Sequence, residues 1–434
     1  MLKFKKINKE IRTLLLNFLS LTILQAANYI FPLLTIPYLI RVLGIERFGL
    51  ITFAQVFISF FLVLTDYGFS LSATRDISVN RENNQIINRI INTAFIIKAL
   101  MCLISFSLLV LIVFFIPKFS QHKELYFYSF ILIPGQTFLP IWFFQGIEKM
   151  KTITILNLIS KVVFTLLIFI LIKYPSDYIY VNVINGFGSL ISTIIGIILL
   201  VKTVDFKLRL SSIYDIKTQL REGWHFFMTN ATIHVSLSSN LFILGIFAPP
   251  IALGYYSIAE KVFIMVRTFA SLLYQVVYPR VCKLAQNSFD EFKTFLVQLF
   301  IGILVAFLPI CIILFVFAET IVYWIAGEML YGAVVVLRIL SFAPLLAALN
   351  IPTAQSLLAF YHIKPYAFIT SAAVFINVLL NIFLAKHFFE RGTALSALLT
   401  EFFITTSLYV YVEIYYKELS LFKNLKFNLN LKLR

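Results

Sequence analysis

Long apolar stretches recur along the whole chain, and each is long enough to cross a membrane. A spanning helix needs about 20 mostly apolar residues, because the hydrocarbon core is about 30 Å thick and a helix rises about 1.5 Å per residue. Twelve stretches meet this condition, and they predict an all-α polytopic membrane protein. They cover residues 14–40, 48–70, 92–116, 126–146, 153–173, 179–203, 223–247, 251–281, 294–318, 331–352, 366–386 and 393–416.

The N-terminus carries five basic residues within Met1–Thr13, a pattern that also begins a signal peptide. The apolar run that follows continues to Ile40, which is too long for the hydrophobic core of such a peptide. We therefore expect an uncleaved first helix.

Basic residues are distributed unevenly between the two sets of alternate connections. Twenty-four of the 36 Lys and Arg lie on the side of the two termini, seven on the other side and five within the spans. Because cytoplasmic connections are rich in Lys and Arg, both termini are predicted to be cytoplasmic.

Composition supports a membrane protein: 60% of the residues are hydrophobic and only 13% are charged. The net charge of +16 would suggest nucleic acid in a soluble protein, but here it follows the topology, so we expect no nucleic-acid partner. Three separated cysteines predict neither a disulfide framework nor a metal site. The chain lacks phosphate-loop, zinc-protease and nucleophile-elbow motifs. We expect no enzyme activity, no cofactor and no metal.

The chain divides into two halves of six spans. Gly49–Ala54 and Gly254–Ala259 share a Gly-x4-Ala spacing and open equivalent spans of the halves. The predicted division has four parts. They are a six-helix bundle at 1–203, a cytoplasmic linker at 204–222, a second six-helix bundle at 223–416 and a basic cytoplasmic tail at 417–434.

Polar side chains follow one helix face in the first two spans of each half. Because polar groups are costly against lipid, these faces predict a shared central cavity, and hydrogen bonding between packed helices is the alternative. The residues are Gln25, Asn28 and Thr35; Thr52, Gln55, Ser59 and Asp66; His225, Thr229, Thr232 and Ser236; and Tyr256, Glu260, Arg267, Ser271 and Tyr274.

Five basic residues lie within the spans, where a cation at the helix centre costs about 2.5–3.5 kcal/mol. They are Lys98, Lys161, Lys261, Arg267 and Arg338. Arg267 shares a helix face with Glu260, so we expect it either to bind an anionic substrate or to pair with Glu260. The other deep cations are weaker candidates, and Lys98, near its span's end, is expected to extend to the cytoplasmic interface.

Three acidic residues within the spans, Asp66, Glu260 and Glu401, are candidates for carrying a coupling proton or Na⁺. Pairing with the same basic residues is their structural alternative. Proline pairs in spans 1, 4 and 10 predict kinks that can act as hinges.

Four segments resemble the Wzx-type O-antigen flippases, of the polysaccharide transporter branch of the multidrug/oligosaccharidyl-lipid/polysaccharide superfamily. PYLIRVLGIERFG at 37–49 and TDYGFSLSATRD at 65–76 are similar to the family's N-terminal signature. WFFQGIEKM at 142–150 and LGYYSIAEK at 253–261 are similar to further segments of it.

The resemblance implies two six-helix bundles around a central cavity, in a bacterial inner membrane. It implies that an undecaprenyl-diphosphate-linked oligosaccharide repeat unit moves from the cytoplasmic to the periplasmic leaflet by alternating access, during O-antigen and lipopolysaccharide biosynthesis. A polysaccharide polymerase and a chain-length regulator are further partners that the sequence alone does not decide.

A diphosphate needs cations, a glycan needs polar groups, and sugar rings stack on aromatic rings. The expected substrate-binding residues are Arg267, Lys261, Lys161, Arg338, Gln25, Asn28, Gln55, Thr232, Tyr256 and Tyr274.

Two other functions stay open. A drug or small-solute antiporter of the same superfamily shares the fold, which does not choose the cargo. A membrane polysaccharide polymerase or glycosyltransferase predicts a large outer catalytic loop, whereas the longest outer connection here, near 319–330, has about a dozen residues.

Overall fold

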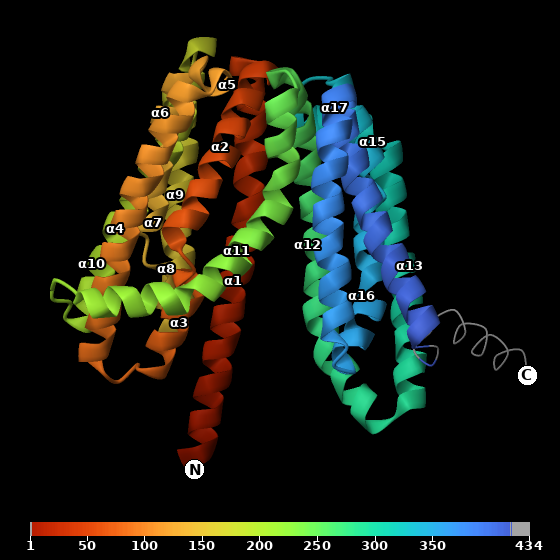
Figure 1. The fold of residues 1–434 in the computed structure, drawn as a ribbon, viewed down its shortest axis with the longest axis horizontal. Coiled ribbons are helices and arrows are strands. Elements are labelled where there is room, and N and C mark those ends of the chain that lie inside the picture. Colours follow the sequence, from red (N-terminus) through yellow and green to blue (C-terminus); the bar gives the residue numbers. More distant parts are fainter. Residues whose placement is uncertain (1, 417, 419–434) are drawn as a thin grey trace, which may run out of the picture. The chain divides into compact units, whose positions relative to one another are not determined.

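A computed structural model describes the backbone of residues 2–416 and 418, and the side chains of Leu19, Ser20 and residues 22 onward (Figure 1). The predicted basic tail at 417–434 therefore lies outside the described residues, apart from Glu418. Every regular element in the described range is a helix. In chain order they are α1 (Leu2–Leu43), α2 (Ile45–Asp66), α3 (Phe69–Val79), α4 (Asn84–Phe115), α5 (Pro117–Ser120), α6 (Lys123–Ser129), α7 (Leu132–Thr137), α8 (Ile141–Gly146), α9 (Met150–Leu171), η1 (Pro175–Tyr180), α10 (Val181–Val204), α11 (Ile213–Phe247), α12 (Pro250–Asn287), α13 (Phe289–Val316), α14 (Ala318–Ala326), α15 (Tyr331–Leu340), α16 (Ala343–Ala359) and α17 (Ile363–Tyr415).

The chain forms two compact units, Met1–Ser239 and Asn240–Arg434, and the division falls within α11. In the N-terminal unit, α10 packs against α9 and α7, α1 packs against α9, and α3 packs against α8. In the C-terminal unit, α12 contacts α15 and α16, and α16 contacts α13 and α17.

Eleven apolar helical segments in the described residues are long enough to cross a membrane, and the last, α17, has 53 residues, enough for two crossings. Phe389 has a left-handed φ of 48° and interrupts the helix. Asn377 Nδ2 donates to Ser396 Oγ at 3.3 Å, although 19 residues of straight helix extend about 28 Å. The chain must therefore reverse at Phe389, and Figure 1 shows α17 folded back on itself. The structure thus confirms the predicted twelve-span all-α fold.

Two of the spans are broken into shorter helices near prolines, at equivalent places in the two halves. The fourth is divided into α6, α7 and α8, and Pro140 precedes α8. The tenth is divided into α15 and α16, with Pro344 in the first turn of α16. A proline in the first turn of a helix loses no hydrogen bond, whereas inside a helix it removes one. By contrast, α1 remains one helix through Pro32 and Pro37.

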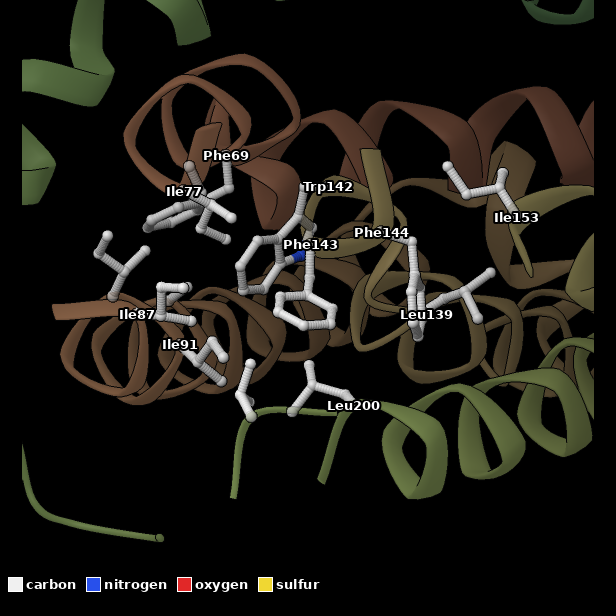
Figure 2. Close-up of a cluster of buried hydrophobic side chains, with 14 of the residues drawn as sticks. Phe69, Ile77, Ile87, Ile91, Leu139, Trp142, Phe143, Phe144, Ile153 and Leu200 are labelled. Atoms are coloured by element: carbon white, nitrogen blue, oxygen red, sulfur yellow. The ribbon is translucent and has the colours of Figure 1, made fainter. Parts of the chain in front are cut away.

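The core of the N-terminal unit gathers where α3, α4, α8, α9 and α10 meet. Figure 2 shows Trp142 and Phe143 of α8 lying among Phe69, Ile77 and Ile91. These side chains are nearly or fully buried. The C-terminal unit has its own core, in which Phe292 of α13, Leu357 of α16 and Leu408 of α17 are fully buried. Each unit therefore has an apolar interior of its own.

The reversal in α17 depends on a close approach at Gly392. A Cβ atom there would collide with the Leu384 carbonyl oxygen, which is backbone and cannot move aside cheaply. We predict that Gly392→Ala lowers the free energy of unfolding by about 2 kcal/mol or more, measured by thermal unfolding in detergent. Gly302→Ala is the matched control, because nothing lies within 4 Å of a Cβ at Gly302. Equal stability of the two variants would contradict this description of the reversal.

Candidate functional site

The N-terminal unit contains a partly buried ion pair at the junction of two helix breaks. Lys98 of α4 is 2% exposed, and its Nζ lies 3.2 Å from Asp66 Oδ1 at the end of α2. The same ammonium donates to the carbonyl oxygen of Thr137, at the end of α7, at 3.1 Å. The hydroxyl groups of Thr137 and Thr65 hydrogen-bond each other at 2.8 Å. We call Lys98, Asp66, Thr65 and Thr137 the Lys98 cluster.

The Lys98 cluster holds the chain where two spans are interrupted. After Asp66, Tyr67 and Gly68 take left-handed φ values of 46° and 79° and end α2. Asp66 Oδ2 accepts the backbone N–H of Ser70, which satisfies a donor in the first turn of α3. The expectation that Lys98 extends to the cytoplasmic interface is therefore wrong, because its charge is neutralised inside the unit.

The C-terminal unit has a second ion pair between two spans. Arg267 NH2 of α12 lies 3.1 Å from Glu401 Oε1 of α17, and the side chains are 44% and 8% exposed. The guanidinium also lies over the Phe263 ring, 5.7 Å from its centre. The acidic partner of Arg267 is thus Glu401, which matches the structural alternative given for this acid, and the alternative pairing of Arg267 with Glu260 is not the one found. An arginine has five N–H donors, so this partly exposed guanidinium retains donors for a ligand.

Other predicted residues on α12 lie in different surroundings. Lys261 is exposed, whereas Tyr256 is only 1% exposed. The Tyr256 hydroxyl faces the side chains of Asn240 and Glu260. In this conformation Tyr256 therefore packs inside its unit, whereas the Lys261 side chain is accessible and the neighbouring Glu260 is half-buried.

Several predicted cavity residues make hydrogen bonds within helices or between packed helices. Gln55 Nε2 donates to Asn182 Oδ1 at 2.8 Å, and Asn182 Nδ2 donates to Ser129 Oγ at 2.8 Å. This chain of bonds connects α2, α10 and α6. Asn28 and Gln25 bond each other at 3.3 Å on α1. The Gln55 contacts match the alternative interpretation of the stripes as helix-packing groups, whereas the Gln25–Asn28 bond stays within one helix.

The remaining predicted residues are placed as follows. Arg338 NH2 lies 3.0 Å from Glu319 Oε1, an ion pair between α15 and α14. Thr232 is exposed, and its hydroxyl donates to the Met228 carbonyl oxygen one turn earlier. Three others complete the set: half-buried Lys161 on α9, half-buried Tyr274, whose ring stacks on that of Tyr278, and half-buried Glu260.

Asparagines contribute contacts that the sequence analysis did not single out. Asn377 Nδ2 donates to Thr400 Oγ1 at 2.9 Å, and Asn381 Nδ2 donates to Asn240 Oδ1 at 3.2 Å. A spacing of four residues in an apolar helix is the available signal, because it places both amides on one helix face. Within the described residues, His, Cys, Asp and Glu side chains form no cluster of three that could hold a metal ion.

Two of the segments that carry the family resemblance contact each other in the N-terminal unit. Thr74 Oγ1 donates to the Trp142 carbonyl oxygen at 3.2 Å. A Cβ atom at Gly146 would lie 3.1 Å from the Thr74 carbonyl oxygen, and 2.9 Å from the Cβ atom of Ile77, which directly follows the first of these segments. These segments therefore dock α3 on α8.

Comparisons with known proteins agree on one family. Residues 14–285 match the family described as "Polysaccharide biosynthesis protein". A relative from Escherichia coli (strain K12), described as "Putative O-antigen transporter", is 27% identical over 398 residues, which are 91% of this chain and 96% of the relative. A relative from Shigella dysenteriae with the same description is 30% identical over 268 residues, 62% of this chain and 67% of the relative.

Solved structures share the fold. The lipid II flippase MurJ in an inward closed conformation has a TM-score of 0.64 at 15% identity, over 93% of this chain and 89% of that one. A multidrug resistance MATE family transporter in an inward-facing conformation has a TM-score of 0.66 at 11% identity, over 93% and 98% of the two chains. These relatives and neighbours are transporters and flippases, in agreement with the expectation that the chain is not an enzyme.

The Lys98 cluster gives a prediction for stability. Removing Lys98 leaves the half-buried Asp66 carboxylate without its counter-charge, so we expect Lys98→Met to lower the free energy of unfolding by about 2 kcal/mol. Asp66→Asn should then cost much less in the Lys98→Met background than alone, with a coupling energy of about 1–3 kcal/mol. Unfolding in detergent measures all four members of this cycle. Additive losses would show that the two groups do not interact, and Lys202→Met at the end of α10 is the exposed control.

A second prediction concerns pH at the connection between α3 and α4, outside the spans. Arg81 NH2 lies 2.7 Å from Glu148 Oε1, and Arg81 Nε donates to the Gly146 carbonyl oxygen at 2.9 Å. The hydrogen bond from Arg81 holds the pKa of Glu148 below its usual value. A lowered pKa means that the pair stabilises the fold above the ordinary carboxyl pKa of about 4.3, and that this contribution is lost as pH falls through the lowered value.

We therefore expect Glu148→Gln to lower the unfolding temperature at pH 7, and the difference from the natural protein to shrink below about pH 4. In an Arg81→Gln background the same substitution should have little effect at either pH. A difference that stays constant down to pH 3 would contradict the proposed role of the pair.

Proposed function

Because the chain belongs to the polysaccharide biosynthesis protein family, we propose that it is a flippase for a lipid-linked oligosaccharide such as an O-antigen repeat unit. The observation that carries this proposal is the match with "Putative O-antigen transporter" along 91% of this chain and 96% of the relative. The fold, shared with a lipid II flippase, supports it. The chain is a multi-pass membrane protein. It acts on a lipid-linked substrate in the bacterial inner membrane, which it carries from the cytoplasmic to the periplasmic leaflet by alternating access.

Arg267 is the first candidate for binding the diphosphate of the substrate. Its guanidinium is 44% exposed while it contacts Glu401, and a guanidinium binds phosphate oxygens through two parallel N–H bonds. Lys261, exposed on the same helix, adds a second positive charge. Lys161 and Arg338 are weaker candidates. Arg338, on the short helix α15, already pairs with Glu319.

The glycan requires polar partners, because its hydroxyl groups lose hydration when it leaves water. Gln25, Asn28 and Thr232 are exposed or half-buried and remain candidates, as does Tyr274 for stacking on a sugar ring. Gln55 and Tyr256 would have to leave their present contacts to bind a substrate.

Substrate binding can be coupled to an ion through Glu401. A diphosphate that binds Arg267 competes with the Glu401 carboxylate, which is 8% exposed. A buried carboxylate that loses its counter-charge favours the binding of a proton or Na⁺. Asp66, paired with Lys98, and Glu260, beside Tyr256, are the other candidates for coupling. We also propose that both termini are cytoplasmic and that a polysaccharide polymerase and a chain-length regulator act as partners.

The role of Arg267 gives a direct prediction. Loss of a charge-assisted bond costs roughly 1.5–3 kcal/mol, so Arg267→Ala should slow transfer of a labelled polyprenyl-diphosphate oligosaccharide across reconstituted vesicles by about tenfold or more. Arg280→Ala is the matched control, because Arg280 is exposed on the same helix and lies over the Phe295 ring. Normal transfer by a correctly folded Arg267→Ala protein would remove Arg267 from the mechanism.

The choice of cargo has its own test. A multidrug transporter shares this fold, so a drug or solute antiporter is the competing function. We expect a strain that lacks the protein to accumulate glycolipid in the cytoplasmic leaflet and to lose surface polysaccharide. Unchanged glycolipid levels together with increased drug sensitivity would favour the antiporter.

A further inference from the structure

A polar pocket lies in the N-terminal unit where three helix ends meet. The pocket has a volume of about 510 Å³. It lies between the beginning of α4, the end of α10 and residues 205–212, the part of the predicted linker that precedes α11 and is called the linker below. Residues that line it include Asn84, Gln85, Arg89, Lys207, Arg209 and Asp215. The pocket belongs to neither ion pair discussed above.

The linker is fixed on α4 through its backbone. Asn88 Oδ1 accepts the N–H of Lys207 at 3.0 Å, and Asn92 Oδ1 accepts the N–H of Arg209 at 2.9 Å. Asn92 Nδ2 also donates to the Lys207 carbonyl oxygen at 3.0 Å. The two asparagines thus hold the backbone of alternate residues and leave the linker side chains outside this hydrogen-bonding pattern.

The charge of the pocket favours an anion. Arg89 and Asp215 form a two-bond ion pair that closes one wall and is neutral overall. Lys207 and Arg209 add two positive charges, and Asp205, 3.9 Å from Lys207, offsets only one of them. The side-chain amides of Asn84 and Gln85 on the same wall provide N–H donors.

Apolar side chains alternate with these cations and are exposed, and one of them, Leu210, also borders the pocket. Leu208 is 84% exposed and Leu210 is 96% exposed, and Ile213 and Tyr214 follow as further exposed apolar residues. Val204, one helical turn before Leu208, ends a membrane span, so the segment lies near the boundary of the bilayer. Exposed leucines beside cations at that boundary are suited to acyl chains beneath a phosphate headgroup.

We propose that this pocket binds the phosphate headgroup of an anionic phospholipid, with Lys207 and Arg209 at the phosphate and Leu208 and Leu210 among the acyl chains. The binding site is independent of the transported cargo. A soluble phosphate would use the cations without the leucines, and so the exposed leucines favour a lipid. The lipid joins the linker to the membrane surface on the face predicted to be cytoplasmic.

The test uses the purified full chain, titrated in detergent with dioctanoyl phosphatidylglycerol and examined by native mass spectrometry. Each basic side chain at an anionic lipid surface contributes about a factor of five to binding. We therefore expect K207Q/R209Q to weaken binding about thirtyfold and L208S/L210S to weaken it as well. The matched control is K217Q/R221Q, which removes two exposed charges outside the pocket and should change binding less than about twofold.

Three results would overturn the proposal. Equal weakening by the control variant would indicate unspecific surface charge. Competition by inorganic phosphate at the concentration of the lipid would indicate a soluble ligand. If K207Q/R209Q lost binding of a polyprenyl diphosphate but kept binding of phosphatidylglycerol, the pocket would be assigned to the cargo. Thermal unfolding of each variant checks that the exposed substitutions leave the fold intact.

Discussion

A charge within the bilayer needs a counter-charge, and both units meet this constraint by joining two spans through an ion pair. In each unit a basic residue on one span meets an acidic residue on another: Lys98 meets Asp66, and Arg267 meets Glu401. Lys98 also donates a hydrogen bond to the carbonyl oxygen of Thr137 at a helix break. The same ammonium therefore satisfies an acceptor that the interrupted helix leaves without an intrahelical donor. In the N-terminal unit a single lysine thus neutralises a carboxylate and hydrogen-bonds a backbone carbonyl group. The pair in the C-terminal unit is more exposed and is therefore better suited to exchange its partner.

Much of the fold could be predicted from the sequence, because span length and apolar composition are local properties. The twelve spans are confirmed, including the two that meet at Phe389 within α17. The break between α2 and α3 was not predicted. It depends on left-handed backbone at Tyr67 and Gly68, where a Cβ on the glycine would lie 2.7 Å from Phe226 Cβ of α11. Such a contact joins residues far apart in the sequence, and periodicity carries no information about it.

The candidate site was harder to predict, since a polar face shows that partners exist and not which ones they are. Glu260 and Arg267 share a face, but seven residues of helix separate them by about 10 Å along the axis. Glu401 comes from a neighbouring span and reaches the guanidinium directly. The predicted exit of the Lys98 side chain to the cytoplasmic interface is wrong for a related reason. Its position near the end of a span suggested an aqueous exit, whereas the adjoining helices supply an acid and a carbonyl oxygen closer to it.

The asparagine pair on α4 has a consequence for how the linker can change over time. In this region Asn88 and Asn92 bond the peptide groups of residues 204, 207 and 209, and nearly all amino acids present the same peptide groups. Mutational drift in the linker can therefore alter its affinity for surrounding molecules while its attachment persists. Proline is the exception, because at position 207 or 209 it would delete the N–H that the asparagine accepts. The backbone of the linker thus provides its attachment to α4, and its side chains determine which molecules it binds. Related chains can therefore change these side chains without losing the attachment.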